Sequence, residues 1–277
     1  MSGSVVTMDE ARSALRASAL RTAGLLAGIQ DTSRPTSNLT WTVGETGAHL
    51  LVALRAYTDS LTGAVDRWAG HIPDVANYHD RMAAVTTGTL TSVPERAPGD
   101  LAQLLPKAVD GFLAASDGRS GEDRVATPWY GSTVSLPLRA ATCLLLGEQV
   151  IHGGDIARAV GTPWPIRRDD AVLIIEAVRA MMPVLVDTAA SREATIACAI
   201  HVRRASEFMV RVRHGTVTVE PLDAQRVDCH LSADPVAFVK VAYGRMGQWE
   251  GILRGGLLSW GRKPWVALRF RGLFLNP

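Results

Sequence analysis

Glu148 and His152, one helical turn apart, interrupt the apolar stretch LLLGEQVIHGGDIARAVG at residues 144–161. Residues four apart on a helix share one face, with roughly 5–6 Å between their Cβ atoms. A buried carboxylate is costly without a partner, and a divalent metal ion can be that partner. The pair alone does not define a site, because a Glu and a His at this spacing also occur by chance, and a buried His commonly just forms a hydrogen bond.

A third ligand would have to come from another helix, and His49 is the best candidate. It lies in GAHLLVAL, a second apolar run with helical periodicity. Facing helices of a bundle can bring such side chains together around a metal ion. Two imidazoles and one carboxylate leave at least one coordination position open, which is typical of catalytic zinc sites. Zinc suits this ligand set, although nickel, iron or cobalt would also bind.

Asp155 has two interpretations. It could accept a hydrogen bond from His152 and support this ligand from outside the metal's own shell, or it could pair with Arg158 on the helix surface. Glu45 also lies four residues before His49. It is explained as the capping-box partner of Thr42, so we do not predict a second metal.

These side chains require helices to position them, and the first 160 residues have helical character. Capping boxes, apolar periodicity and stop signals predict helices at 7–29, 42–63, 74–87, 100–116 and 138–160. Gly161 provides the end of the last one. The segment 125–137 is predicted to be irregular or extended. Long helices with one long crossing indicate a four-helix bundle.

The second half has a different pattern, which begins after the proline-containing hinge GTPWPIRRDD. One more helix is predicted at 169–186, and alternating apolar residues then favour a sheet, with strands at 195–202, 207–214, 216–222, 228–233 and 257–262. Asp234 and Pro235 start a further helix, and residues 264–274 form the last. We therefore predict a multidomain chain, with an all-α bundle at 1–165 and a smaller α+β domain at 166–277.

The composition excludes several classes of protein. The chain has 277 residues, of which 47% are hydrophobic and 20% charged, and a formal net charge of +2 that gives no support for nucleic-acid binding. Without a long apolar stretch or an apolar signal core, we expect no membrane span and a cytoplasmic protein. Cys143, Cys198 and Cys229 are far apart in sequence and read as reduced core residues. The oligomeric state is not predicted.

Two segments resemble the mycothiol-dependent maleylpyruvate isomerase family, whose first domain is a DinB-like bundle. They are WTVGETGAHLLVAL at 41–54 and LLLGEQVIHGGDIARAVGTPWPI at 144–166. The resemblance implies His49, Glu148 and His152 as metal ligands and mycothiol as the thiol cosubstrate. This chain departs from the family at Gly154, where a bulkier residue, often Trp, is common. The departure concerns the shape of the pocket and not the ligands.

The second half resembles the sterol-carrier-protein-like domain that often follows this bundle. The resemblance rests on CHLSADPVAFVKVAYGR at 229–245 and GLLSWGRKPWVALRF at 256–270. Family members place a catalytic arginine in this region, so Arg254 and Arg262 are the candidates. Taken singly, each is more often explained as a solvated surface charge. A catalytic arginine from this half would hold a carboxylate-bearing substrate, since a guanidinium binds carboxylates in a bidentate manner.

The predicted function is that of an enzyme in which a divalent metal, with zinc as the first choice, activates a thiol cofactor. The thiolate would attack a small electrophilic substrate, in an isomerisation or in an S-transfer. The alternative is a non-catalytic binding module, in which the metal stabilises the fold and the second half holds a small apolar ligand. A zinc-containing regulator that binds a protein partner is not favoured, because the usual Cys-rich spacing is absent.

Overall fold

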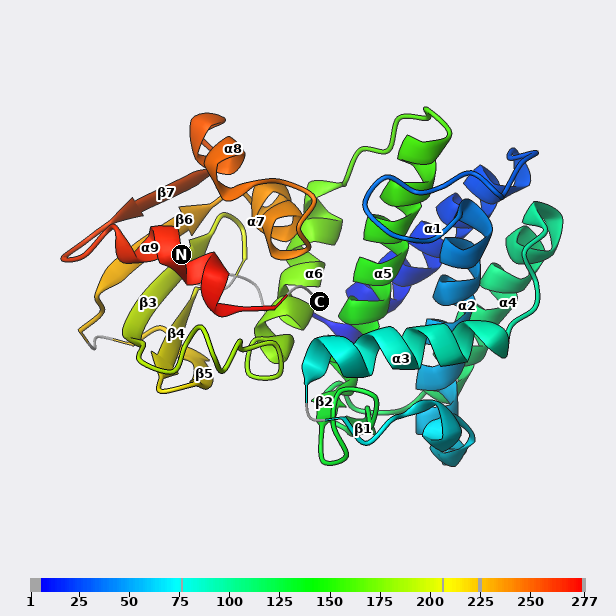
Figure 1. Ribbon diagram of the computed structural model, residues 1–277, viewed down its shortest axis with the longest axis horizontal. Coiled ribbons are helices and arrows are strands. Elements are labelled where there is room, and N and C mark those ends of the chain that lie inside the picture. The colour runs from blue at the N-terminus through cyan, green and yellow to red at the C-terminus, as the bar shows by residue number, and fades with distance from the viewer. Residues whose placement is uncertain (1–5, 76, 206, 224–225, 276–277) are drawn as a thin grey trace. The chain divides into compact units, whose positions relative to one another are not determined.

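The computed structural model describes residues 6–75, 77–205, 207–223 and 226–275, and it divides into two compact units (Figure 1). The first unit is Thr7–Ile166 and is mainly helical, while the second holds the described residues from Arg167 onward and combines helices with a mixed sheet. The predicted class, a helical part followed by an α+β part, is confirmed at this level. No helix of the described residues has the length and apolarity needed to cross a membrane.

Four long helices form the body of the first unit, and α1 and α2 each pack against both α4 and α5. The four long helices are α1 (Met8–Ala27), α2 (Val43–Thr62), α4 (Pro98–Ala115) and α5 (Leu138–Ala159). A shorter helix, α3 (Tyr78–Thr91), lies between α2 and α4 in the sequence. A 3-10 helix, η1 (Val65–His71), and the antiparallel strands β1 (Arg124–Ala126) and β2 (Ser135–Pro137) complete the unit. Leucines from all four long helices are fully buried between them: Leu15, Leu50, Leu101 and Leu145.

Local signals set most helix ends where the sequence predicts them. Both capping boxes, Thr7 with Glu10 and Thr42 with Glu45, are present. At the end of α5, Gly161 has φ +72, and the N–H groups of Gly161 and Thr162 donate to carbonyls of the last turn. The prediction for 74–87 is wrong at both ends, because the Asn77 side chain caps a helix that begins at Tyr78 and continues to Thr91. Ala76 of that prediction lies outside the described residues.

Trp164, just after α5, fills the space beside Gly153 and Gly154. A Cβ built on Gly153 would lie 2.4 Å from Trp164 Cζ2, and one on Gly154 would lie 3.2 Å from Trp164 Cδ1. The indole N–H donates to the Val150 carbonyl at 2.9 Å, and the Arg21 guanidinium carbon lies 3.6 Å from the ring centroid. The Trp164 ring therefore leaves no room for a Cβ at position 153. It also lies where a side chain at position 154 would project.

Gly153→Ala is expected to destabilise the first unit by about 1–3 kcal/mol, because overpacking of a fixed contact displaces side chains and backbone. Chemical denaturation with urea measures this. Gly24→Ala is the matched control, since Gly24 lies within α1 and a Cβ there meets nothing within 4 Å. That change should be neutral or stabilise by up to about 1 kcal/mol. Equal effects of the two substitutions would contradict the role assigned to Trp164.

The second unit contains a five-stranded sheet in the order β5-β4-β3-β6-β7, in which β3 and β6 are parallel and the other pairs antiparallel. Its strands are β3 (Thr195–Val202), β4 (Phe208–Arg213), β5 (Thr216–Pro221), β6 (Cys229–Ala233) and β7 (Leu257–Trp260). Its helices are α6 (Arg168–Met181), α7 (Pro235–Ala242), α8 (Gln248–Leu253), α9 (Val266–Phe270) and the 3-10 helix η2 (Arg271–Leu273). The short helix α8 was not predicted.

The parallel pairing of β3 with β6 brings two of the three cysteines together. Cys198 on β3 and Cys229 on β6 are register partners, and their sulfur atoms lie 3.1 Å apart. All three cysteines are buried free thiols. Two residues far apart in sequence are thus neighbours in the core, because β6 pairs with β3 across a separation of 31 residues.

Candidate metal centre

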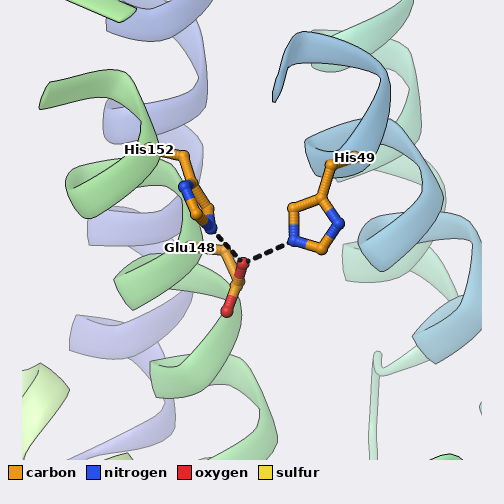
Figure 2. A group of neighbouring side chains, drawn as sticks. All are labelled: His49, Glu148 and His152. Atoms are coloured by element: carbon orange, nitrogen blue, oxygen red, sulfur yellow. Dashed lines mark hydrogen bonds and ion pairs between the residues drawn. The ribbon is translucent and has the colours of Figure 1, made fainter. Parts of the chain in front are cut away.

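His49 on α2 and the pair Glu148 and His152 on α5 converge on one point (Figure 2). Glu148 Oε2 lies 3.1 Å from His49 Nε2 and 3.2 Å from His152 Nε2. One potential ligand atom from each residue lies within 4.8 Å of the others, and within the described part of the chain this is the one such group of three. The ring centroids of His49 and His152 are 5.1 Å apart.

The helices explain this convergence. Glu148 and His152 share a face of α5 because they are four residues apart, and α2, which packs against α5, presents His49 to that face. The side chains of His49, Glu148 and His152 are 19%, 19% and 13% exposed. They are therefore mostly buried by packing and retain a small exposure to solvent.

The contacts among these side chains change the pKa values of Glu148 and His152. Burial raises the pKa of Glu148, but hydrogen bonds and charges from His152 and His49 outweigh it and hold the pKa well below its usual range. Burial lowers the pKa of His152, whereas hydrogen bonds to Asp155 and Glu148 raise it, with a net result of about 9. Glu148 is thus an anion at neutral pH, as a metal ligand must be.

Asp155 lies behind His152 on the side away from Glu148. It is 2% exposed, and its Oδ2 lies 3.2 Å from His152 Nδ1, while its Oδ1 accepts a hydrogen bond from Asn38 Nδ2 at 3.0 Å. A carboxylate on the outer nitrogen of a histidine fixes the ring's orientation and leaves Nε2 free to bind a metal. The side chain thus faces the histidine and not the exposed helix surface where Arg158 lies.

Two further residues at the site, Asn38 and Trp41, come from the loop before α2 and were not predicted. The Trp41 ring centroid lies 4.9 Å from that of His49 and 6.1 Å from that of His152. Trp41 directly precedes the capping box, so an apolar residue next to a helix start was the available signal. No comparable signal marks Asn38. Trp41 shields one side of both imidazoles and limits their movement.

Asp155→Asn is expected to weaken metal binding by about 10–100-fold, the range found when the outer partner of a ligand histidine is removed. Asparagine has nearly the same shape but no negative charge to orient the imidazole N–H. Competition with a fluorescent zinc chelator measures the affinity. Arg158→Gln is the control, because the exposed Arg158 is the surface partner that the sequence also allowed. If only Arg158→Gln lowers the affinity, the orienting role is wrong.

The donor set fits a divalent metal. Two imidazole nitrogens and one carboxylate oxygen suit zinc and other first-row ions, and His152 is already oriented through Nδ1. His49, Glu148 and His152 would hold the ion. The assignment of these three residues as ligands remains a prediction for metal analysis.

The predicted arginines Arg254 and Arg262 both have carboxylate partners within the second unit. Arg254 Nη2 lies 2.9 Å from Glu250 Oε1, one turn back on α8, and the Arg254 side chain is 69% exposed. Arg262 pairs with Asp228, which also contacts Lys263 and accepts a hydrogen bond from the Ala197 N–H. Arg262 thus has a structural partner of its own, and a catalytic role for either arginine stays a prediction.

Asp228 makes the stability of the second unit depend on pH. Burial raises its pKa, but the Ala197 N–H, Lys263 and Arg262 together hold it below its ordinary value. A depressed folded-state pKa gives stability that is present above the unfolded-state pKa and is lost as the pH falls through the folded one. Asp228→Asn should therefore cost about 1–3 kcal/mol at pH 7, and the difference from wild type should shrink below about pH 4. Urea denaturation at several pH values checks this; a constant difference would contradict it.

Comparisons with known proteins show the family and the fold that this chain resembles. A model of the family described as "Mycothiol maleylpyruvate isomerase N-terminal domain" matches residues 15–157. The chain is similar to the crystal structure of the mycothiol-dependent maleylpyruvate isomerase, with 16% identity and a TM-score of 0.51 over 92% of this chain and 93% of that chain. A histidine-to-alanine mutant of that enzyme gives 15% identity and a TM-score of 0.52 over the same shares, 92% and 93%. At these identities the likeness establishes the fold. A search of curated proteins gives no match.

Proposed function

Because the chain belongs to the mycothiol maleylpyruvate isomerase family, we propose that it is a metal-dependent enzyme that uses mycothiol as its thiol cosubstrate. The observation that carries the proposal is the convergence of His49, Glu148 and His152 within 4.8 Å. With these three protein ligands, a fourth position would be left for a small molecule, as in catalytic zinc sites. The metal-stabilised binding module is the alternative.

The chemistry follows from the open position. A divalent ion held there would lower the pKa of a thiol and favour its thiolate. The thiolate sulfur can add to the activated double bond of an electrophile, and the electron pair of that bond moves onto the activating group as an enolate. The remaining single bond rotates, and the returning electron pair expels the thiolate and restores the double bond in the trans form. If the enolate instead takes a proton from water, the sulfur stays attached as a thioether, and the reaction is an S-transfer. The substrate is thus a small molecule with an activated double bond.

The chain's own residues contribute position and charge. Glu148 supplies the negative charge of the site, and Asp155 with Asn38 orients His152. Because the pKa of His152 is raised to about 9 and a histidine binds a metal as the neutral imidazole, metal binding would release a proton from His152. Trp41 forms an apolar wall beside both imidazoles. Such preorganised groups act without having to rearrange during the reaction.

We extend the proposal to the two parts of the chain. Residues 1–165 would form a DinB-like four-helix bundle, built from α1, α2, α4 and α5, and residues 166–277 a sterol-carrier-protein-like domain. Arg254 or Arg262 would hold a substrate carboxylate, since guanidinium and carboxylate form a bidentate pair. Alanine substitution of each arginine, with the carboxylate substrate's KM and kcat measured separately, tests the last point.

The main experiment incubates zinc-loaded protein with maleylpyruvate and mycothiol, and in parallel with glutathione or cysteine. Turnover with mycothiol alone is the expected result. Nuclear magnetic resonance of the products then separates the two reactions, because isomerisation returns free thiol whereas S-transfer leaves a thioether adduct. If no thiol supports turnover and a protein side chain closes the metal's fourth position, the binding module replaces the enzyme.

A further inference from the structure

A cavity of about 560 Å³ lies on the helical unit, formed by α2, η1, α4 and the turn after α3. Leu51, Val93 and Leu104 give it an apolar floor, next to the buried Trp68. This volume lies within the range of about 300–1,000 Å³ that is typical of small-molecule sites. It is large enough for a ligand with one aromatic ring system or a short aliphatic chain.

The cavity is separate from the metal centre. Arg55, which lines it, follows His49 on α2 by six residues. At 3.6 residues per turn, this separation rotates the side chain by about 240°, so Arg55 points about 120° away from His49 around the helix axis. None of the three predicted metal ligands lines the cavity. A ligand here would therefore not touch the group that we assign to catalysis.

The charges around the cavity are predominantly positive. Arg55 and Lys107 line it from α2 and α4, and Arg67 and His71 line it from η1. The one carboxylate in the lining, Asp59, is already engaged, since it accepts a hydrogen bond from Trp68 Nε1 at 3.1 Å and lies 3.5 Å from Arg67 Nη1.

Arg55 and Lys107 have no comparable partner. No hydrogen bond or ion pair of either side chain occurs with another described residue. Arg55 is half-buried, whereas Lys107 is exposed, so a missing counter-charge is costly mainly for Arg55. An anion in the cavity would supply that counter-charge, and Lys107 lines the same cavity.

We propose that this cavity binds a small organic anion, whose acid group pairs with Arg55 and Lys107 and whose apolar body lies against Leu51, Val93 and Leu104. Arginine and lysine form charge-assisted hydrogen bonds to carboxylate, sulfonate or phosphate oxygens. The apolar floor favours a ligand with a hydrocarbon part over an inorganic ion, because burial of that part adds affinity. The proposal does not depend on the function of the metal centre.

The test uses the full chain and 8-anilinonaphthalene-1-sulfonate, an anion with an aromatic body whose fluorescence rises on binding. Saturable binding to wild type is expected, with about tenfold weaker binding for Arg55→Gln and for Lys107→Gln, as the loss of one charge-assisted contact implies. Arg16→Gln is the matched control, because Arg16 is an exposed residue of α1 that pairs with Asp110. Unchanged affinity in both cavity variants would overturn the proposal.

A second measurement avoids substitutions altogether. The chain has three lysines, Lys107, Lys240 and Lys263, and of these only Lys107 belongs to the helical unit. Acetylation of wild type followed by mass spectrometry should show that the probe slows the modification of Lys107 and leaves the rates of Lys240 and Lys263 unchanged. Equal rates at Lys107 with and without a saturating probe would place the anion elsewhere and overturn the proposal.

Discussion

Replacing His49 with alanine is expected to weaken zinc binding by at least roughly a hundred- to a thousandfold. The binding free energy of zinc at sites with several protein ligands is about 10 kcal/mol or more in favour of binding. One ligand of three therefore contributes about 3 kcal/mol, which corresponds to at least about a hundredfold in affinity. His49 supplies one of the three converging donors. Competition with a chelator, together with elemental analysis of protein purified in the presence of zinc, measures the loss.

The controls for this substitution separate ligand loss from unfolding. His79→Ala removes an exposed histidine of α3, and it should leave both metal content and affinity unchanged. Glu148 keeps its contact with His152 in the His49→Ala protein, so the circular dichroism spectrum should stay that of a folded helical protein. Retention of wild-type zinc affinity by folded His49→Ala would exclude His49 as a ligand, and the site would then have to be built from other residues.

The helices and the shared face of Glu148 and His152 could be predicted from the sequence because their determinants are local. A capping box spans four residues, and Glu148 with His152 spans five, so the same positions that set the helix also set the shared face. His49 required one further assumption, that two apolar helices face each other. The contact between α2 and α5 supports this assumption.

The loop that contributes Asn38 shows what local signals miss. Its path is fixed by backbone pairing, with the Thr36 N–H donating to the Trp41 carbonyl and the Val43 N–H to the Arg34 carbonyl. Asn38 then contacts Asp155 across 117 residues of sequence. Neither periodicity nor capping encodes such a contact, because it depends on where α2 and α5 lie once packed.

The same limit applies to two other features. The neighbouring thiols of Cys198 and Cys229 follow from the register of parallel strands, and register is set by the burial of a whole sheet face. The glycine at 154 was read as a departure that leaves the pocket shape open. Instead, Trp164, ten residues later in sequence, occupies the adjacent space. In each case the feature depends on how segments distant in sequence pack together, which a local sequence pattern does not encode.

Removal of the metal is expected to lower the mycothiol-dependent rate by about a thousandfold or more, and restoration of zinc should recover it. A thiol with an ordinary pKa near 8.5 is about 3% thiolate at pH 7, so complete ionisation alone gives only about thirtyfold. The remainder must come from holding the sulfur in line with the substrate, and such positioning can contribute several further powers of ten. The measurement compares initial rates of protein stripped with a chelator, shown to be metal-free, and of the same sample reloaded with zinc.

The pH dependence of the two samples distinguishes this explanation from a structural role of the metal. If ionisation of the thiol is promoted at the site, the rate of the reloaded protein should change little between about pH 6.5 and 8.5, because the sulfur is already ionised. Any residual rate of the stripped protein should rise by about fiftyfold in total over the same interval, following the free thiol with its pKa near 8.5. A metal that only stabilised the fold would instead change the amount of active protein, and the two profiles would then be parallel.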